Sequence, residues 1–230
     1  MLNLLTLAIV LNLDPSAILK KADAFRSPQG GFETKVVVTD RDGDKSEFLV
    51  FIEGNDKSLI VTKAPARDVG RNMLMIDRDM WMFMPSVNRA VRIALRQRLM
   101  GQVAQGDISR MKWFGDYKAS IAKNEKTGIR LDLVADRENL TYDRISLLVD
   151  TKDYRPLVAE FQTAQGKVLK VAEFENYGAL GGSTRARTIK ITDALKPSDS
   201  STIQLQEMKE TKFPTGFFSQ TNLQSPKSPR

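Results

Sequence analysis

Residues 66–101 read ARDVGRNMLMIDRDMWMFMPSVNRAVRIALRQRLMG, a stretch in which apolar runs, turn residues and arginines follow one another closely. Two short apolar runs, 72–76 and 80–84, flank an Asp-Arg-Asp turn, which is typical of a β-hairpin. After a Pro-Ser-containing turn, residues 90–96 alternate apolar and basic side chains with a period of two. We therefore expect three consecutive antiparallel strands, with a helix as the competing interpretation of the last one, because its arginines also recur at helical offsets.

The strand expected at 80–84 is apolar on both of its faces. It reads Met-Trp-Met-Phe-Met, and Met73, Leu74 and Met75 repeat the pattern on the preceding strand. A strand with one solvated face would alternate apolar and polar residues. Methionine is flexible and fills irregular binding surfaces. The pattern therefore indicates either a core strand covered on both sides or the wall of an apolar cavity.

The three strands supply the candidate binding residues. The candidate lipid contacts are Met73, Met75, Trp81, Phe83, Val91 and Ile93. A guanidinium group pairs well with phosphate or carboxylate. The candidate contacts to an anionic head group or to a partner protein are Arg89, Arg92 and Arg98. Because the aromatic residues alternate with the methionines, only one of the two sets can point inward, and we expect the aromatic face to do so.

The composition of the 230 residues excludes several classes of protein. There is no cysteine, hence no disulfide, Cys-ligated zinc or thiol nucleophile. There is no histidine either, which removes the commonest general base and most transition-metal sites. We therefore expect no enzyme, no cofactor and no metal. A carboxylate-dependent hydrolase is the least favoured hypothesis.

The net charge of +7, from 35 basic and 28 acidic residues, favours an anionic partner such as a membrane surface or a lipid head group. A basic protein with no such partner is the simpler interpretation. Nucleic-acid binding would need aromatic residues interleaved with basic ones on an exposed face. The aromatic residues of 80–84 lie in an apolar run instead, so we expect no nucleic-acid partner.

The two ends of the chain differ from its middle. Residues 1–13 are apolar and resemble the core of a secretory signal, but they lack the usual positive start. They are too short to span a bilayer, which takes about 20 residues. A helix packed on the domain is the alternative. We expect an exported protein with a possible signal peptide at 1–13, a single domain at 14–223 and a flexible tail at 224–230.

The rest of the pattern is mainly β. Asp14 as N-cap and Pro15 at the first helical position predict one N-terminal helix, and a second, short helix is expected to begin near Asp107. Short alternating segments predict about ten or eleven antiparallel strands in all. Besides the three above, the candidates are 32–39, 47–53, 58–63, 119–124, 129–135, 144–150, 157–162, 168–177, 183–193 and 202–212.

An ordered set of short motifs runs along the chain from Asp14 to Leu223. Its members are Ala64–Arg71, Met80–Ser86, Arg89, Arg92–Ile93, Gln97–Gly101, Asp153–Leu157 and Phe217–Leu223, with Ala17–Leu19 and Ala22–Asp23 in the opening helix. In this set the chain resembles the outer-membrane lipoprotein-sorting protein family, relatives of the periplasmic carrier LolA. Residues 102–107 depart from the Ser-Asp-Phe-like stretch that the family usually has there.

The resemblance implies a strongly curved, half-open antiparallel β-barrel of mainly β (α+β) class, with an apolar concave face and a short helical lid. It implies binding of the acyl chains of a lipoprotein or lipid in the periplasm of a Gram-negative envelope, without catalysis. Several relatives lie beside genes for RND-type transporters, so such a transporter or another envelope protein is an implied partner. The alternative is a sensor or adaptor that binds a partner protein through the same apolar surface.

Overall fold

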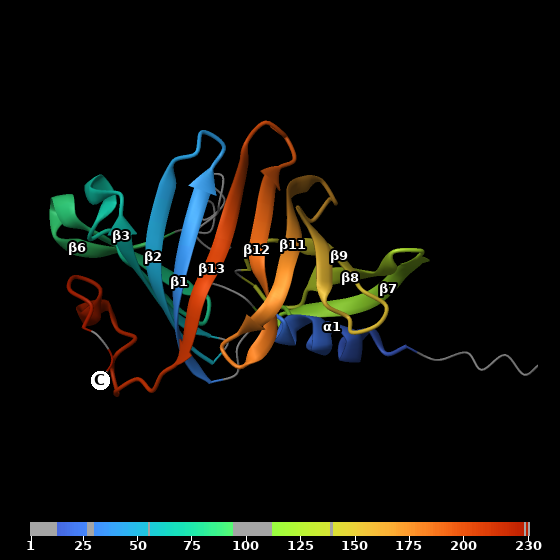
Figure 1. The fold of residues 1–230 in the computed structure, drawn as a ribbon, viewed down its shortest axis with the longest axis horizontal. Coiled ribbons are helices and arrows are strands. Elements are labelled where there is room, and N and C mark those ends of the chain that lie inside the picture. Colours follow the sequence, from blue (N-terminus) through green and yellow to red (C-terminus); the bar gives the residue numbers. More distant parts are fainter. Residues whose placement is uncertain are drawn as a thin grey trace, which may run out of the picture.

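The computed structural model describes residues 13–26, 30–54, 56–93, 112–138, 140–227 and 229. In this part of the chain one helix, α1, lies against a single sheet of 13 antiparallel strands (Figure 1). The elements are α1 (Pro15–Ala24), β1 (Gly31–Asp40), β2 (Lys45–Glu53), β3 (Lys57–Ala64), β4 (Met73–Ile76), β5 (Asp79–Met84), β6 (Arg89–Arg92), β7 (Tyr117–Glu125), β8 (Gly128–Ala135), β9 (Arg144–Val149), β10 (Pro156–Gln162), β11 (Val168–Leu180), β12 (Ser183–Asp193) and β13 (Ser200–Glu210). The 3-10 turns are η1 (Ala66–Asp68), η2 (Pro85–Val87) and η3 (Gln220–Asn222).

The sheet consists of two meanders that meet in its middle. Its strand order is β6-β5-β4-β3-β2-β1-β13-β12-β11-β10-β9-β8-β7, so the first and last strands of the chain pair with each other. Each of the thirteen candidate segments contains a strand, so the sheet has 13 strands where about ten or eleven were expected. The strand expected at 90–96 ends at Arg92, and residues 94–96 lie outside the described residues. The residues around 90 form a strand and not a helix, since Val91 pairs with Met82.

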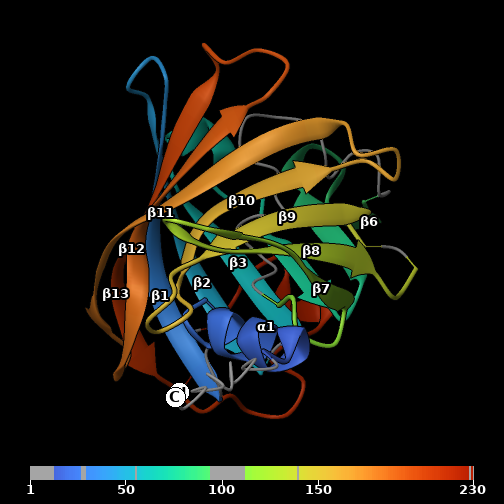
Figure 2. The same ribbon diagram turned by 90° about the vertical axis from the view of Figure 1, so that its right-hand side faces the viewer.

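The sheet is strongly curved and stays open. Figure 2 looks onto its open side, where α1 crosses in front of the strands. The edges are β6 and β7, which have no strand beyond them in the described part of the chain. Irregularities in the pairing occur at Lys35/Val36, Glu47/Phe48, Ile121/Lys123 and Phe161/Gln162. Such bulges bend a strand and increase its twist, and the half-open curved sheet that was expected is confirmed.

Helix α1 begins as its sequence predicts. The carboxylate Oδ1 of Asp14 accepts a hydrogen bond from the backbone N–H of Ser16 at 2.9 Å, and Pro15 occupies the first turn. Ile18, Leu19 and Ala22 are buried against the sheet. We call the face of the sheet that α1 covers the inner face, and the opposite face the outer face.

Each face of the sheet carries its own apolar cluster. The inner cluster joins α1 to residues from both arms of the sheet, among them Ile60, Leu131 and Ile203. The outer cluster covers only β2–β6, and residues 213–224, which we call the C-terminal segment, supply Phe217 and Leu223 to it. The apolar strands of the first meander are therefore covered on both sides.

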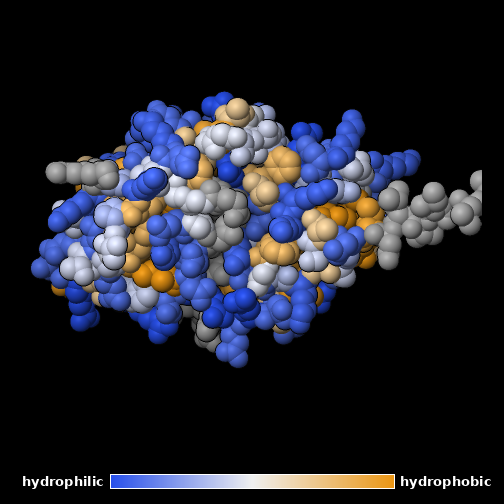
Figure 3. All heavy atoms as spheres, turned by 90° about the horizontal axis from the view of Figure 1, so that it is seen from below, coloured by the Kyte–Doolittle hydropathy of each residue, from blue (hydrophilic) through white to orange (hydrophobic). Residues whose placement is uncertain are grey.

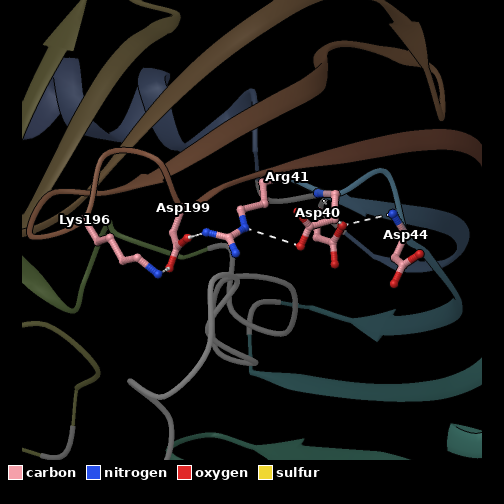
Figure 4. A network of polar contacts seen from close by, with 6 residues as sticks. Asp40, Arg41, Asp44, Lys196 and Asp199 are labelled. Atoms are coloured by element: carbon pink, nitrogen blue, oxygen red, sulfur yellow. Dashed lines mark hydrogen bonds and ion pairs between the residues drawn. The ribbon is translucent and has the colours of Figure 1, made fainter.

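Polar contacts join two hairpins that are distant in sequence (Figure 4). The β1–β2 turn is held by Asp40, whose Oδ1 accepts from the backbone N–H of Asp44 at 2.9 Å. From this turn the Nη1 atom of Arg41 donates to Oδ1 of Asp199 at 2.5 Å, and Nζ of Lys196 lies 3.0 Å from Oδ2 of the same residue. Hydrogen bonding to Lys196 holds the pKa of Asp199 below its usual value. The β1–β2 and β12–β13 turns are thus tied together.

Candidate functional site

The strand register divides the candidate lipid contacts between the two faces. Met73 pairs directly with Met82, and Leu74 with Trp81. Directly paired side chains lie on the same face of an antiparallel sheet. Met73 and Met82 contact the inner cluster, whereas Leu74 and Trp81 belong to the outer one. Val91 pairs with Met82 and therefore lies on the inner face.

The expectation that the aromatic face points inward is wrong. Trp81 and Phe83 lie on the outer face, in the cluster that contains Phe217 and Leu223. The reason is the C-terminal segment, which covers that face and makes aromatic side chains favourable there. A lipid-binding role of the inner-face residues Met73, Met75, Val91 and Ile93 stays a prediction.

The three candidate arginines are not brought together over the inner face. Arg89 and Arg92 are exposed on the edge strand β6, and Arg92 forms an ion pair with Asp79. Alternation places them on opposite faces of that strand. Arg98 and the short helix expected near Asp107 lie outside the described residues.

An apolar hollow opens on the inner face of the other arm of the sheet. Its cavity volume is about 40 Å³, which is room for roughly two or three water molecules. The lining is formed by Arg26, Lys112, Trp113, Tyr117, Leu140, Thr141, Tyr142, Ile145, Phe161, Ala172, Phe174, Ile189, Ile191 and Ile203. Half of these fourteen residues come from strands β9–β13, where every second residue points inward.

A buried cation lies at the border of this hollow. The guanidinium carbon of Arg26 is 3.6 Å from the centre of the Trp113 ring and 5.6 Å from that of Phe174. The two rings pack edge to face, with their centres 6.0 Å apart. A cation above an aromatic face is attracted by the ring quadrupole. The lining thus combines an apolar surface with a positive charge, and Lys112 adds a second one.

Asp23 fastens the wall of the hollow to α1. The backbone N–H groups of Trp113 and Phe114 donate to its Oδ1 and Oδ2 atoms at 3.0 and 3.2 Å. Burial raises the pKa of Asp23 to about 6, and the nearby charges of Arg26 and Lys112 oppose the rise only in part. The carboxylate therefore positions Trp113, and burial makes its ionised form less favourable than it would be in water.

The interior of the hollow is apolar in character. The hydroxyl group of Tyr117 donates to the backbone carbonyl of Tyr142 at 2.9 Å, so it is turned towards the protein backbone. The rings of Tyr142 and Phe161 stack with their centres 4.4 Å apart. In the described ranges no three acidic side chains gather into a metal site. An arrangement of this kind suits binding of an amphiphile with an apolar body and an anionic end.

Sequence reasoning missed this hollow. Trp113 lies in a stretch without clear periodicity, and Arg26 follows the helix where no motif marks it. The alternation of β9–β13 identifies inward residues, but only the curvature of the sheet shows that they converge.

The surface seen from below is mostly hydrophilic, with hydrophobic residues gathered in patches in its left and right halves (Figure 3).

Among the residues that the structure describes, no helix has the length and apolar character needed to cross a membrane.

Comparison with known proteins identifies the family. A family model described only as "-like: Uncharacterized protein" matches residues 54–225. No curated protein matches the sequence significantly. Among solved structures, a LolA superfamily protein from Nitrosomonas europaea is similar, with 34% identity, a TM-score of 0.83 and coverage of 91% of this chain and 99% of its own.

Two further solved structures share the fold at lower identity. A domain named for outer membrane lipoprotein sorting from Vibrio parahaemolyticus is 20% identical, with a TM-score of 0.78 over 91% of this chain and 98% of its own. A DUF1329 family protein from Desulfovibrio piger is 17% identical, with a TM-score of 0.79 over 92% and 100%. The 34% identity over nearly the whole length, on the same curved sheet, shows that this chain belongs to the LolA superfamily.

Proposed function

We propose that the protein is a non-enzymatic carrier that binds acyl chains of a lipoprotein or lipid on the inner face of its sheet. The observation that carries this proposal is the apolar lining of the hollow beside the guanidinium group of Arg26. The hollow itself is narrow, about 40 Å³, so an acyl chain would have to part the side chains that line it. The apolar lining takes the chain, and Arg26 with Lys112 meets the anionic end. The half-buried inner-face residue Val91 extends the same apolar face along the other arm of the sheet, where Met73 is buried in the inner cluster.

The energetics favour a chain-like ligand. Burial of one methylene group contributes about 0.8 kcal/mol. Several buried methylene groups would therefore supply much of the affinity, before the costs of opening the hollow and of ordering the ligand and the protein are subtracted. A charge-assisted contact to Arg26 adds orientation as well as affinity.

Family membership and the apolar start of the sequence support a place in the periplasm, with delivery towards the outer membrane. An RND-type transporter or another envelope protein would be the partner of that delivery. These assignments belong to the proposal and are tested separately, by N-terminal sequencing of the mature protein and by crosslinking in cells.

Acyl binding is tested by displacement of a fluorescent fatty acid and by native mass spectrometry of the gently purified protein. Ala172 lines the hollow, so Ala172→Leu should fill it and lower the affinity, whereas Ala172→Gly should keep it. Circular dichroism shows whether both variants fold. A purified protein free of lipid that does not bind fatty acid would contradict the proposal, and a dominant protein partner without lipid would favour the adaptor instead.

A further inference from the structure

Exposed apolar and basic side chains gather at one end of the β5–β6 hairpin. Val69, Met84 and Val87 are 51%, 40% and 53% exposed, which is high for residues of this type. Arg67, Arg71 and Arg89 are exposed in the same short stretch of chain. We call these six residues the Val87 patch.

The backbone holds the Val87 patch together. A Cβ atom added to Gly70, whose φ is +90°, would lie 3.3 Å from Cγ of Pro85, so the turn around η1 packs directly against η2. Met84 pairs with Arg89 across the hairpin. Gln224 donates through Nε2 to Oδ1 of Asn88 at 2.9 Å and links the turn to the C-terminal segment. The patch therefore has a defined shape.

The charge of the Val87 patch is positive. Asp68 lies 3.6 Å from Nε of Arg67 and 3.0 Å from Nη1 of Arg71. Three arginines and this one carboxylate leave a local charge of +2. The exposed apolar side chains stand among these charges, so an occupant must accept both.

We propose that the Val87 patch docks the protein on the surface of a membrane that contains anionic lipids. Apolar side chains at turns insert at the boundary between head groups and acyl chains, while basic residues around them meet the phosphates. A guanidinium group suits phosphate in geometry and in charge. A protein partner would be expected to use Trp or Tyr as well as Arg in a packed, desolvated centre, and the patch has no aromatic residue.

The inference goes beyond acyl binding and does not depend on it. The hollow is lined by residues 112–203 and by Arg26, whereas the patch lies within residues 67–89. Substitutions in one should therefore leave the other intact.

The test is co-sedimentation of the full chain with large vesicles. Vesicles of phosphatidylglycerol and phosphatidylethanolamine should bind the protein, and vesicles of phosphatidylcholine should not. Each basic residue near an anionic surface contributes roughly fivefold in affinity. The double variant Arg67→Ala/Arg71→Ala should thus bind about 25-fold more weakly, and Asp68→Asn should bind more tightly because it raises the local charge.

Two control comparisons test the apolar side chains of the patch and the position of its charges. In each, the same kind of substitution is made elsewhere on the surface. Val87→Ser should weaken binding, whereas Leu195→Ser, at a residue 62% exposed on another turn, should not. Lys190→Ala/Lys209→Ala removes the same charge from two exposed lysines that also neighbour carboxylates, at 3.5 and 3.8 Å, and should leave binding close to that of the wild type.

Three results would overturn the proposal. Control variants that weaken binding as much as the patch variants would show attraction by net charge alone. Equal binding to phosphatidylcholine vesicles would remove the role of the arginines. A patch that crosslinks to an acidic protein in the envelope while vesicles bind independently of it would identify a protein surface. Ala172→Leu should keep vesicle binding, so a failure of acyl binding and a failure of docking are distinguishable.

Discussion

The substitution Asp23→Asn removes a buried carboxylate whose ionisation the fold opposes. Burial raises the pKa of Asp23 from 3.8 to about 6. One pKa unit corresponds to about 1.4 kcal/mol, so ionisation in the folded state costs about 3 kcal/mol more than in the unfolded chain. The folded protein binds this proton more tightly. The contribution of Asp23 to the free energy of unfolding should therefore fall as the pH rises from about 4 to about 6 and should be constant outside that range.

The Asp23→Asn variant keeps one side-chain oxygen for the N–H of Trp113, but its amide group presents a donor to the N–H of Phe114. The lost hydrogen bond costs roughly 1–3 kcal/mol at every pH. The test is therefore how the free energy of unfolding changes with pH, and not its value at a single pH. Urea unfolding of both proteins between about pH 4 and pH 7 gives the two curves. The free energy of unfolding of the variant, relative to that of the wild type, should increase by about 3 kcal/mol from the low to the high end of this pH range. Parallel curves would show that the fold does not raise the pKa of Asp23.

Three further substitutions test the outer face and the joined hairpins. Phe217→Ala should lower the free energy of unfolding by about 3–5 kcal/mol, because the side chain fills the outer cluster, and urea titration measures it. Asn72→Leu should cost roughly 1–3 kcal/mol, since it leaves the carbonyl of Leu223, 2.8 Å from Nδ2, without a donor, and a neutral result would contradict that role. Arg41→Ala should raise the pKa of Asp199 towards its usual value in an NMR titration, and an unchanged pKa would show that their contact does not persist in solution.

Local signals in the sequence are sufficient to predict the elements. Asp14 and Pro15 mark the start of α1, and short alternating or apolar runs between turn residues mark the strands of the sheet. The helical offsets of the arginines near residue 90 are overridden by pairing with β5, since an edge strand next to a formed hairpin gains backbone hydrogen bonds at once.

Long-range contacts account for the errors. The sequence pattern does not assign Trp81 and Phe83 to the outer face, because nothing near them in sequence shows that residues from beyond position 213 cover it. The hollow is likewise not predicted from the sequence, because its lining residues are far apart along the chain. Arg26 and Trp113 are far apart in sequence and meet where Asp23 binds the backbone at Trp113.

The central claim is that an acyl chain binds on the inner face of the sheet. A fatty acid carrying a photoreactive diazirine, bound to the full chain, irradiated and mapped by peptide mass spectrometry, tests it most directly. Labels are expected on residues that line the hollow, such as Phe161 and Phe174, and these labels should be lost in Ala172→Leu. Labels confined to the outer cluster, at Trp81 or Phe213, would contradict it.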